Sequence, residues 1–337
     1  MKIAVVGAGS IGGYLGARLA LAGESVTFVA RGANLATINS SGFRLIEEDG
    51  SERTATQVRA VQSMPDAGPQ DCVLLALKAH QVAALARDVP ALFHADTTVV
   101  TLQNGIPWWY FHRLGGEYDG RPVTSVDPDG SIAASIPNER IIGSVVYPAS
   151  ELIAPGVVKV VEGNRFSLGE PDNSKSERAL RISDALTRAG FKAPVSSDLR
   201  SEIWLKLWGN LTFNPVSALS HATLATICTF PATRALATEM MREAQTVAEK
   251  LGVRFRIPIE KRIAGAQAVG EHKTSMLQDV ERGRALELDA LLGSVVELAR
   301  MTATDTPRID AIHACTALLA HTLNQQAGRL EIRPRDA

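Results

Sequence analysis

The 337-residue sequence predicts an α/β N-terminal domain with a doubly wound parallel sheet, followed by an all-α C-terminal domain. A glycine-rich turn joins a short apolar run at 2–6 to a helical pattern at 11–22, as in the first strand and helix of such a sheet. Strand-like and helical runs then alternate toward the middle of the chain. After Ser197 strand-like runs largely disappear and helical patterns dominate. We therefore expect two domains, 1–197 and 198–337.

Each predicted element of the N-terminal domain has its own pattern. Gly23 stops the first helix, and the β-rich run 25–30 completes a strand–helix–strand unit. Asp49–Gly50 is a typical hairpin turn between the two β-prone runs of 43–61. Further along we expect strands at 71–78 and 97–102, a helix at 81–93, short β runs at 141–147, 157–162 and 165–168, a helix at 176–190 and a last strand at 191–195. The short β runs lie in a stretch rich in Gly, Pro and Asp, which predicts an antiparallel or mixed extension of the sheet.

The C-terminal domain is predicted to be helical throughout. Pro215 lacks an N–H group, so we expect it to kink or end its helix just beyond Asn214. Helical patterns occur at 199–213, 233–251, 259–269, 284–302 and 308–325.

Charge and cysteine content exclude several classes of function. Lys plus Arg number 35 and Asp plus Glu number 36, so the chain has no global attraction for nucleic acid or an anionic membrane. Three widely spaced cysteines give neither a disulfide framework nor a zinc pattern, and we expect no bound metal. No apolar run approaches the ~20 residues that span a bilayer. We therefore expect a cytoplasmic protein that acts on a small molecule.

The glycine-rich turn has the spacing of a dinucleotide-binding turn. Gly7 permits the tight turn, Gly9 lets the backbone approach a pyrophosphate, and Gly12 lets the helix pack closely on the strand. The pyrophosphate would then lie at the helix N-terminus, where free N–H groups favour negative charge. The predicted phosphate turn therefore comprises Gly7, Ala8, Gly9, Ser10, Ile11 and Gly12.

The end of the second strand favours NADP over NAD. An NAD-binding turn places Asp or Glu there to bind the ribose hydroxyls, whereas this chain has Arg31 after Ala30. A guanidinium can bind a 2′-phosphate through two hydrogen bonds. The alternative is a solvated surface arginine.

Lys206, Asn210 and Asn214 occur at spacings of four, which places them on one helix face. This polar stripe lies in a segment rich in Trp, Leu and Phe. It either faces water or, if buried, needs polar partners such as a substrate carbonyl, hydroxyl or carboxylate.

A second polar group follows in the C-terminal domain. Ser275 could bind a carboxylate, and Glu287 could accept a hydrogen bond from a substrate hydroxyl. The simpler interpretation makes Thr274 or Ser275 a helix N-cap and Glu287 a solvated helix residue.

The sequence resembles the ketopantoate reductase (2-dehydropantoate 2-reductase) family from Met1 to about residue 325. The matching motifs are the glycine turn with Arg31, Leu77-Lys78-Ala79-x-Gln81, Asn104-Gly105, Trp204-x-Lys206-Leu207-x-x-Asn210-x-x-x-Asn214-Pro215, and Ser275-Met276-Leu277-Gln278-Asp279 with Glu287. The resemblance implies a Rossmann-type domain, a helical domain similar to the C-terminal domain of 6-phosphogluconate dehydrogenase, and a cleft between them. It also implies NADPH-dependent reduction of a 2-keto acid to a 2-hydroxy acid, with 2-dehydropantoate giving pantoate for coenzyme A synthesis.

By position, the resemblance makes Lys206 the general acid and Glu287 a ligand of the substrate hydroxyl. An ammonium suits this role because it stabilises the negative charge that develops on the carbonyl oxygen and then donates a proton. The resemblance also implies that Asn210, Asn214 and Ser275 contact substrate, that Lys78 and Gln81 contact cofactor, and that Asn104 contacts both.

The sequence departs from plainer members of this family after Asn104-Gly105. The segment Trp108–Phe111 has four consecutive aromatic residues. They either reshape or cover the substrate pocket, which would suit a bulkier 2-keto acid, or they form a hydrophobic plug or a dimer contact. The alternative functions are a related NADP-dependent hydroxy acid dehydrogenase with a different, bulkier substrate and a non-catalytic NADPH-sensing protein. The sequence is compatible with a homodimer.

Overall fold

The computed structural model describes residues 1–332 and contains two compact units. The first unit comprises residues 1–122 and 127–199. The second comprises residues 123–126 and the chain from Arg200 onward. The chain therefore passes between the units three times, and nothing in the sequence predicted the excursion at 123–126.

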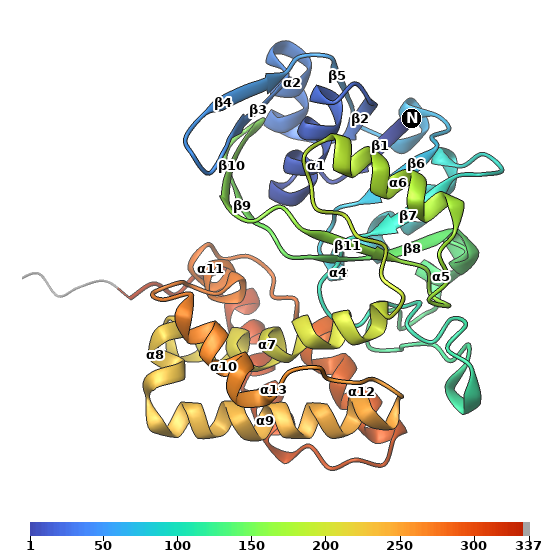
Figure 1. Ribbon diagram of the computed structural model, residues 1–337. Coiled ribbons are helices and arrows are strands. Elements are labelled where there is room, and N and C mark those ends of the chain that lie inside the picture. The colour runs from blue at the N-terminus through green and yellow to red at the C-terminus, as the bar shows by residue number, and fades with distance from the viewer. Residues whose placement is uncertain (333–337) are drawn as a thin grey trace, which may run out of the picture. The chain divides into compact units, whose positions relative to one another are not determined.

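Seven strands of the first unit form one sheet in the order β11-β8-β7-β6-β1-β2-β5 (Figure 1). Every neighbouring pair is parallel except β11 with β8. The chain runs from β1 to β2 on one side and returns to β6 on the other, so the predicted doubly wound sheet is confirmed. Its strands are β1 (Lys2–Val6), β2 (Ser25–Val29), β5 (Val58–Val61), β6 (Cys72–Leu75), β7 (Thr98–Thr101), β8 (Ile141–Val146) and β11 (Phe166–Gly169).

A second sheet of the same unit has the order β4-β3-β10-β9. Strands β3 (Phe43–Ile46) and β4 (Glu52–Ala55) form the predicted antiparallel hairpin around Asp49–Gly50. Strands β9 (Ala149–Ala154) and β10 (Val157–Glu162) pair with each other, and β10 pairs with β3. The prediction that the whole of 141–168 extends the main sheet is therefore wrong for β9 and β10.

Helix α1 (Ser10–Leu21) lies between the two sheets and contacts strands of both. Gly13 and Gly16 permit this close packing, since a Cβ there would lie 2.2 Å from a Phe43 ring atom and 2.5 Å from a Phe28 ring atom. Those two rings stack with centroids 5.1 Å apart. The other helices of the unit are α2 (Gly32–Ser41), α3 (Met64–Ala67), α4 (Ala79–Ala86), α5 (Ser131–Ser135) and α6 (Glu177–Arg188).

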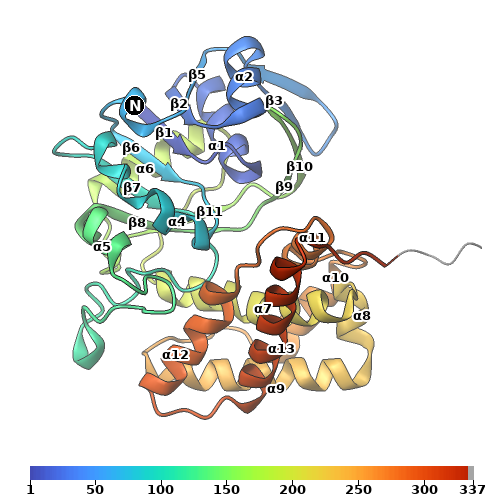
Figure 2. The same cartoon turned by 180° about the vertical axis from the view of Figure 1, so that it is seen from behind.

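All the regular elements of the second unit, within its described residues, are helices (Figure 2). Helix α9 (Pro231–Lys250) packs against α8, α10, α12 and α13. The helices are α7 (Leu199–Ser220), α8 (Leu224–Thr229), α9, α10 (Ile259–Ala268), α11 (Ser275–Glu281), α12 (Ser294–Met301) and α13 (Pro307–Gln325). A π-helical turn, η4 (Asp289–Gly293), precedes α12. No helix within residues 1–332 has the length and apolar character needed to cross a membrane.

Four predicted elements differ from the structure. The predicted helix at 81–93 is divided into α4, which ends at Ala86, and a separate 3₁₀ turn at Val89–Leu92. Helix α7 continues through Pro215 to Ser220, because a proline removes only one hydrogen bond of the helix and the packed helix tolerates that loss. The predicted strand 191–195 forms only isolated bridges to 165 and 168. The predicted helix at 284–302 begins later, with residues 284–287 outside any helix.

Candidate active site

The glycine-rich turn follows β1 and leads into α1. Gly12 has no space for a side chain, because a Cβ there would lie 2.0 Å from the Gly7 carbonyl oxygen. At Gly9 the position of a Cβ is open, with no contact within 4 Å. Gly9 is the N-cap residue of α1, where no side chain caps the helix and no acidic residue occupies the first turn. An open and uncapped helix N-terminus suits an anionic phosphate, so this turn fits the predicted pyrophosphate site.

Arg31 lies at the end of β2 and is the N-cap residue of α2. Its side chain is exposed and makes no hydrogen bond or ion pair within residues 1–332. The guanidinium is therefore accessible to an anionic ligand, as recognition of a 2′-phosphate requires.

Lys78 and Gln81 lie at the start of α4, which follows β6. The Lys78 N–H donates a hydrogen bond of 3.1 Å to Gln81 Oε1. Gln81 thus has a local role as a cap of this helix. The backbone geometry by itself assigns it no contact with a cofactor.

Gln103 connects the ends of β6 and β7, next to Asn104. Its Nε2 donates to the Leu75 carbonyl oxygen at 2.6 Å and to the Leu77 carbonyl oxygen at 3.1 Å. Its Oε1 is buried and has no hydrogen-bond partner among the described residues. Gln103 thus fixes the segment that presents Asn104, and sequence reasoning missed it.

Lys206, Asn210 and Asn214 lie on successive turns of α7, as predicted from their spacing. Asn214 is 7% exposed, and Lys206 and Asn210 are half-buried. The stripe is therefore not a fully solvated helix surface.

Two tryptophans on the same helix are completely buried. Trp208 Nε1 donates a hydrogen bond of 2.7 Å to the Met241 carbonyl oxygen, and its ring centroid lies 4.1 Å from that of Phe255. Trp204 is likewise 0% exposed. These contacts fix the rotation of α7 and with it the direction of the polar stripe.

Lys206 is the most perturbed amine of the second unit. Burial lowers its pKa from the ordinary 10.5 to about 8, and the negative charge of Glu287 partly opposes that shift. Glu287 precedes η4 in sequence and is half-buried. The structure thus brings Lys206 and Glu287 within electrostatic range of each other, as a general acid and a neighbouring hydroxyl ligand would require.

Ser275 is the first residue of α11, and Thr274 is its N-cap. Thr274 Oγ1 accepts a hydrogen bond of 3.3 Å from the Leu277 N–H, so the N-cap interpretation is confirmed for Thr274. The Ser275 hydroxyl instead accepts a long hydrogen bond of 3.5 Å from Asn214 Nδ2. Two predicted substrate residues from different helices therefore lie side by side.

The aromatic segment Trp108–Phe111 is buried within the protein. Its four side chains are at most 5% exposed. Trp109 Nε1 donates to Thr101 Oγ1 at 3.1 Å, and its ring occupies the space that a side chain at Gly143 would need. This burial supports the plug among the alternatives left open by the sequence.

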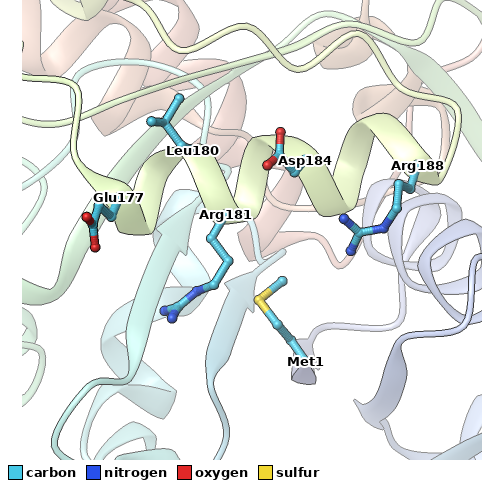
Figure 3. Close-up of a pocket in the computed structure, with 6 residues that line it drawn as sticks. All are labelled: Met1, Glu177, Leu180, Arg181, Asp184 and Arg188. Carbon is cyan, nitrogen blue, oxygen red and sulfur yellow. The ribbon is translucent and has the colours of Figure 1, made fainter.

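A surface depression lies beside Met1 and α6, and none of the predicted site residues lines it (Figure 3). Glu177, Arg181, Asp184 and Arg188 line it, so its charge is mixed. The Met1 ammonium and Arg188 both bind Glu24, the latter at 2.7 Å. These contacts anchor the N-terminus.

Sequence reasoning also missed Glu297 of α12. Its carboxylate accepts hydrogen bonds from Thr124 N (2.8 Å), Thr124 Oγ1 (2.7 Å) and Ser125 N (2.7 Å). This one side chain therefore holds the 123–126 segment in the second unit. A carboxylate and its partners 172 residues away carry no local sequence pattern.

Comparisons with known proteins agree with this architecture. A family model described as "Ketopantoate reductase PanE/ApbA" matches residues 3–173, and its C-terminal counterpart matches residues 198–320. A Mesorhizobium japonicum protein named 2-dehydropantoate 2-reductase is 54% identical, covering 95% of this chain and 98% of its own. A Ralstonia solanacearum structure assigned to the ketopantoate reductases is 40% identical with a TM-score of 0.91, covering 95% of this chain and 98% of its own. A Geobacter metallireducens 2-dehydropantoate 2-reductase structure is 27% identical with a TM-score of 0.82, covering 94% and 99%. The chain belongs to the ketopantoate reductase family.

Proposed function

We propose that this chain catalyses the NADPH-dependent reduction of 2-dehydropantoate, a 2-keto acid, to the 2-hydroxy acid pantoate. The Mesorhizobium japonicum relative carries the name of that reaction at 54% identity. The observation within the structure that best supports the proposal is Lys206, a half-buried ammonium whose pKa is lowered to about 8 beside Glu287.

The proposed cofactor residues belong to residues 1–197. The open helix N-terminus at Gly9 suits the pyrophosphate, and exposed Arg31 suits the 2′-phosphate. Lys78, Gln81 and Asn104, at the ends of β6 and β7, are proposed to contact the nicotinamide half. When bound there, NADPH supplies the hydride that reduces the carbonyl carbon.

The proposed substrate residues belong to residues 198–337. The amides of Asn210 and Asn214 and the hydroxyl of Ser275 offer neutral hydrogen bonds to the carboxylate and hydroxyl groups of the substrate. Glu287 accepts a hydrogen bond from a substrate hydroxyl.

Lys206 Nζ is the proposed proton donor. Its ammonium stabilises the negative charge that develops on the carbonyl oxygen, and it then donates the proton that completes the hydroxyl group. A pKa of about 8 keeps Lys206 mostly protonated near neutral pH, yet lets it release the proton more readily than an ordinary lysine.

A substrate panel tests the reaction. NADPH oxidation is measured with 2-dehydropantoate, smaller 2-keto acids and bulky aromatic 2-keto acids, and we expect the highest kcat/KM with 2-dehydropantoate. Faster turnover of an aromatic 2-keto acid would favour the bulkier-substrate alternative. NADPH binding without turnover of any acid would favour a sensor and contradict the proposal.

Lys206→Ala tests the proton donor. We expect kcat to fall by about 10²–10⁴-fold, because that is the usual contribution of a positioned general acid. The NADPH dissociation constant, measured by fluorescence titration, should stay unchanged. Exposed Lys261 provides the control, since Lys261→Ala removes an amine of the same unit outside the proposed site. A kcat for Lys206→Ala equal to that of Lys261→Ala would reject the assignment.

The wider expectations belong to the same proposal. The three cysteines are free thiols in the structure, which suits a cytoplasmic location. A homodimer would be shown by sedimentation of the purified protein.

A further inference from the structure

The Asn34 side chain bridges two loops that are far apart in sequence. Its Nδ2 donates a hydrogen bond of 3.1 Å to the carbonyl oxygen of Ala8, within the glycine-rich turn. Its Oδ1 accepts a hydrogen bond of 2.9 Å from the Gly156 N–H, at the tip between β9 and β10. Because the two bonds use both ends of one amide, the orientation of that amide is fixed.

Gly156 is a firm anchor for this bridge. Its carbonyl oxygen accepts a hydrogen bond of 2.8 Å from the Arg44 N–H on β3. Its φ is +67°, and a Cβ there would lie 2.8 Å from Thr37 of α2. The tip of the β9–β10 hairpin is therefore held against α2, and Asn34 extends that contact to the glycine-rich turn.

We infer that Asn34 is a positioning residue for the phosphate turn of the cofactor site, an inference that rests on the proposed NADPH site. The C=O and N–H groups of a trans peptide point in opposite directions, and none of the described peptide bonds is cis. Holding the Ala8 oxygen toward Asn34 therefore turns the Gly9 N–H away from α2. Asn34 thus sets the direction of a backbone donor at the helix N-terminus without touching the cofactor.

Asn39 offers a matched control on the same helix. Its Nδ2 donates to the Ala60 carbonyl oxygen at 3.0 Å, and its Oδ1 accepts from the Ala60 N–H at 2.9 Å. Asn39 therefore makes the same pair of bonds as Asn34, but to β5 and not to the glycine-rich turn. The two asparagines should contribute comparably to folding and differently to cofactor binding.

Two ligands separate positioning from general damage. NADPH contains the pyrophosphate and the 2′-phosphate, whereas 2′-AMP contains only the latter. In Asn34→Ala we expect the NADPH dissociation constant to rise by about tenfold, since the misdirected Gly9 N–H loses its hydrogen bond to the pyrophosphate. Binding of 2′-AMP should be unchanged. Asn39→Ala should lower the melting temperature to a similar degree and leave both dissociation constants unchanged.

Three outcomes would overturn the inference while leaving the proposed function intact. One is equal NADPH affinity in Asn34→Ala and Asn39→Ala. Another is an equal loss of affinity for NADPH and 2′-AMP, which would indicate a disturbed α2. If Asn34→Ala does not fold, Asn34→Asp replaces it, because the carboxylate still accepts from Gly156 but cannot donate to Ala8. The measurement is made in high salt, which screens the added negative charge. The third contrary outcome is that Asn34→Asp then binds NADPH as tightly as the wild type. If the wild type itself fails to bind NADPH, the proposed function falls first and this inference falls with it.

Discussion

At the scale of single residues, the interaction between Lys206 and Glu287 predicts the direction in which the pH dependence of kcat shifts when Glu287 is replaced. Glu287 raises the pKa of Lys206 toward its ordinary value, against the larger effect of burial. Glu287→Gln removes that negative charge, so the pKa of Lys206 should fall below about 8. Because the acid form of Lys206 is the proposed proton donor, the alkaline limb of the kcat profile should move to lower pH. An alkaline limb at the same pH in both proteins would show that another group controls it.

Arg31 makes the second prediction at this scale. Arg31→Ala removes an exposed guanidinium that is proposed to bind the 2′-phosphate. A charge-assisted hydrogen bond is worth roughly 1.5–3 kcal/mol, so the preference for NADPH over NADH should fall by about 10–100-fold. NADH serves as the internal control, because its own kcat/KM should not change. An unaltered preference would reject this role for Arg31.

At the scale of elements, the turn between β1 and α1 distinguishes a glycine needed for packing from one needed for ligand access. Gly12→Ala places a Cβ 2.0 Å from the Gly7 oxygen, so the helix must move away from the strand. We expect a loss of several kcal/mol of unfolding free energy, measured by denaturant titration. Gly9→Ala meets no atom within 4 Å and should fold with little loss of stability.

Gly9→Ala should nevertheless weaken NADPH binding, because its methyl group would occupy the open space at the helix N-terminus. Comparing the two variants separates the two roles of the motif. Wild-type NADPH affinity in Gly9→Ala would place the pyrophosphate elsewhere.

Local patterns were enough to predict much of this fold and of the candidate site. The strand, glycine turn and helix at the N-terminus follow from neighbouring residues, and the stripe from Lys206 to Asn214 follows from helical spacing. Pairing between distant strands was not predictable in this way. Val158 pairs with Leu45 on one side and Leu152 on the other, and no local pattern shows that β10 leaves the main sheet.

The site was predictable only where a residue's role is local or shared with the family. Asn34 and Gln103 act through hydrogen bonds to backbone oxygens 26 to 28 residues away, so their spacing shows no periodicity. Pro215 does not end its helix, because Val216, Ser217 and Ala218 beyond it are buried and their packing outweighs the loss of one hydrogen bond.

At the scale of the whole molecule, the chain passes three times between the two units, and Glu297 holds the short segment 123–126 that causes two of these passages. Burial raises the pKa of this carboxyl, but hydrogen bonds from Ser125 and Thr124 outweigh burial and hold the pKa below its usual value. The stability it supplies is therefore complete above the pKa of an unfolded glutamate and is lost as the pH falls through the lowered value.

Glu297→Ala should release the 123–126 segment and lower the unfolding free energy by about 2–4 kcal/mol, since several charge-assisted hydrogen bonds are lost. Thermolysin, which cleaves before apolar residues, should then cut the bond between Ser125 and Val126 faster than in the wild type. Glu243 provides the control, because its carboxylate accepts hydrogen bonds from the Arg308 and Ile309 N–H groups of α13. Glu243→Ala should also destabilise the protein while leaving thermolysin cleavage before Val126 unchanged. Equal cleavage in both variants would mean that Glu297 does not hold the segment.

The passage of residues 123–126 through the second unit also affects how the chain folds during synthesis on the ribosome. Ser125 is made long before Glu297, with 172 residues between their positions in the chain. At roughly 5–20 residues per second, the segment waits on the order of 10–35 s for the carboxylate that binds it. During that interval the emerging first unit carries an unfinished loop, which a protease or chaperone can reach. The 123–126 segment can therefore take its final place only after α12, which carries Glu297, has been synthesised.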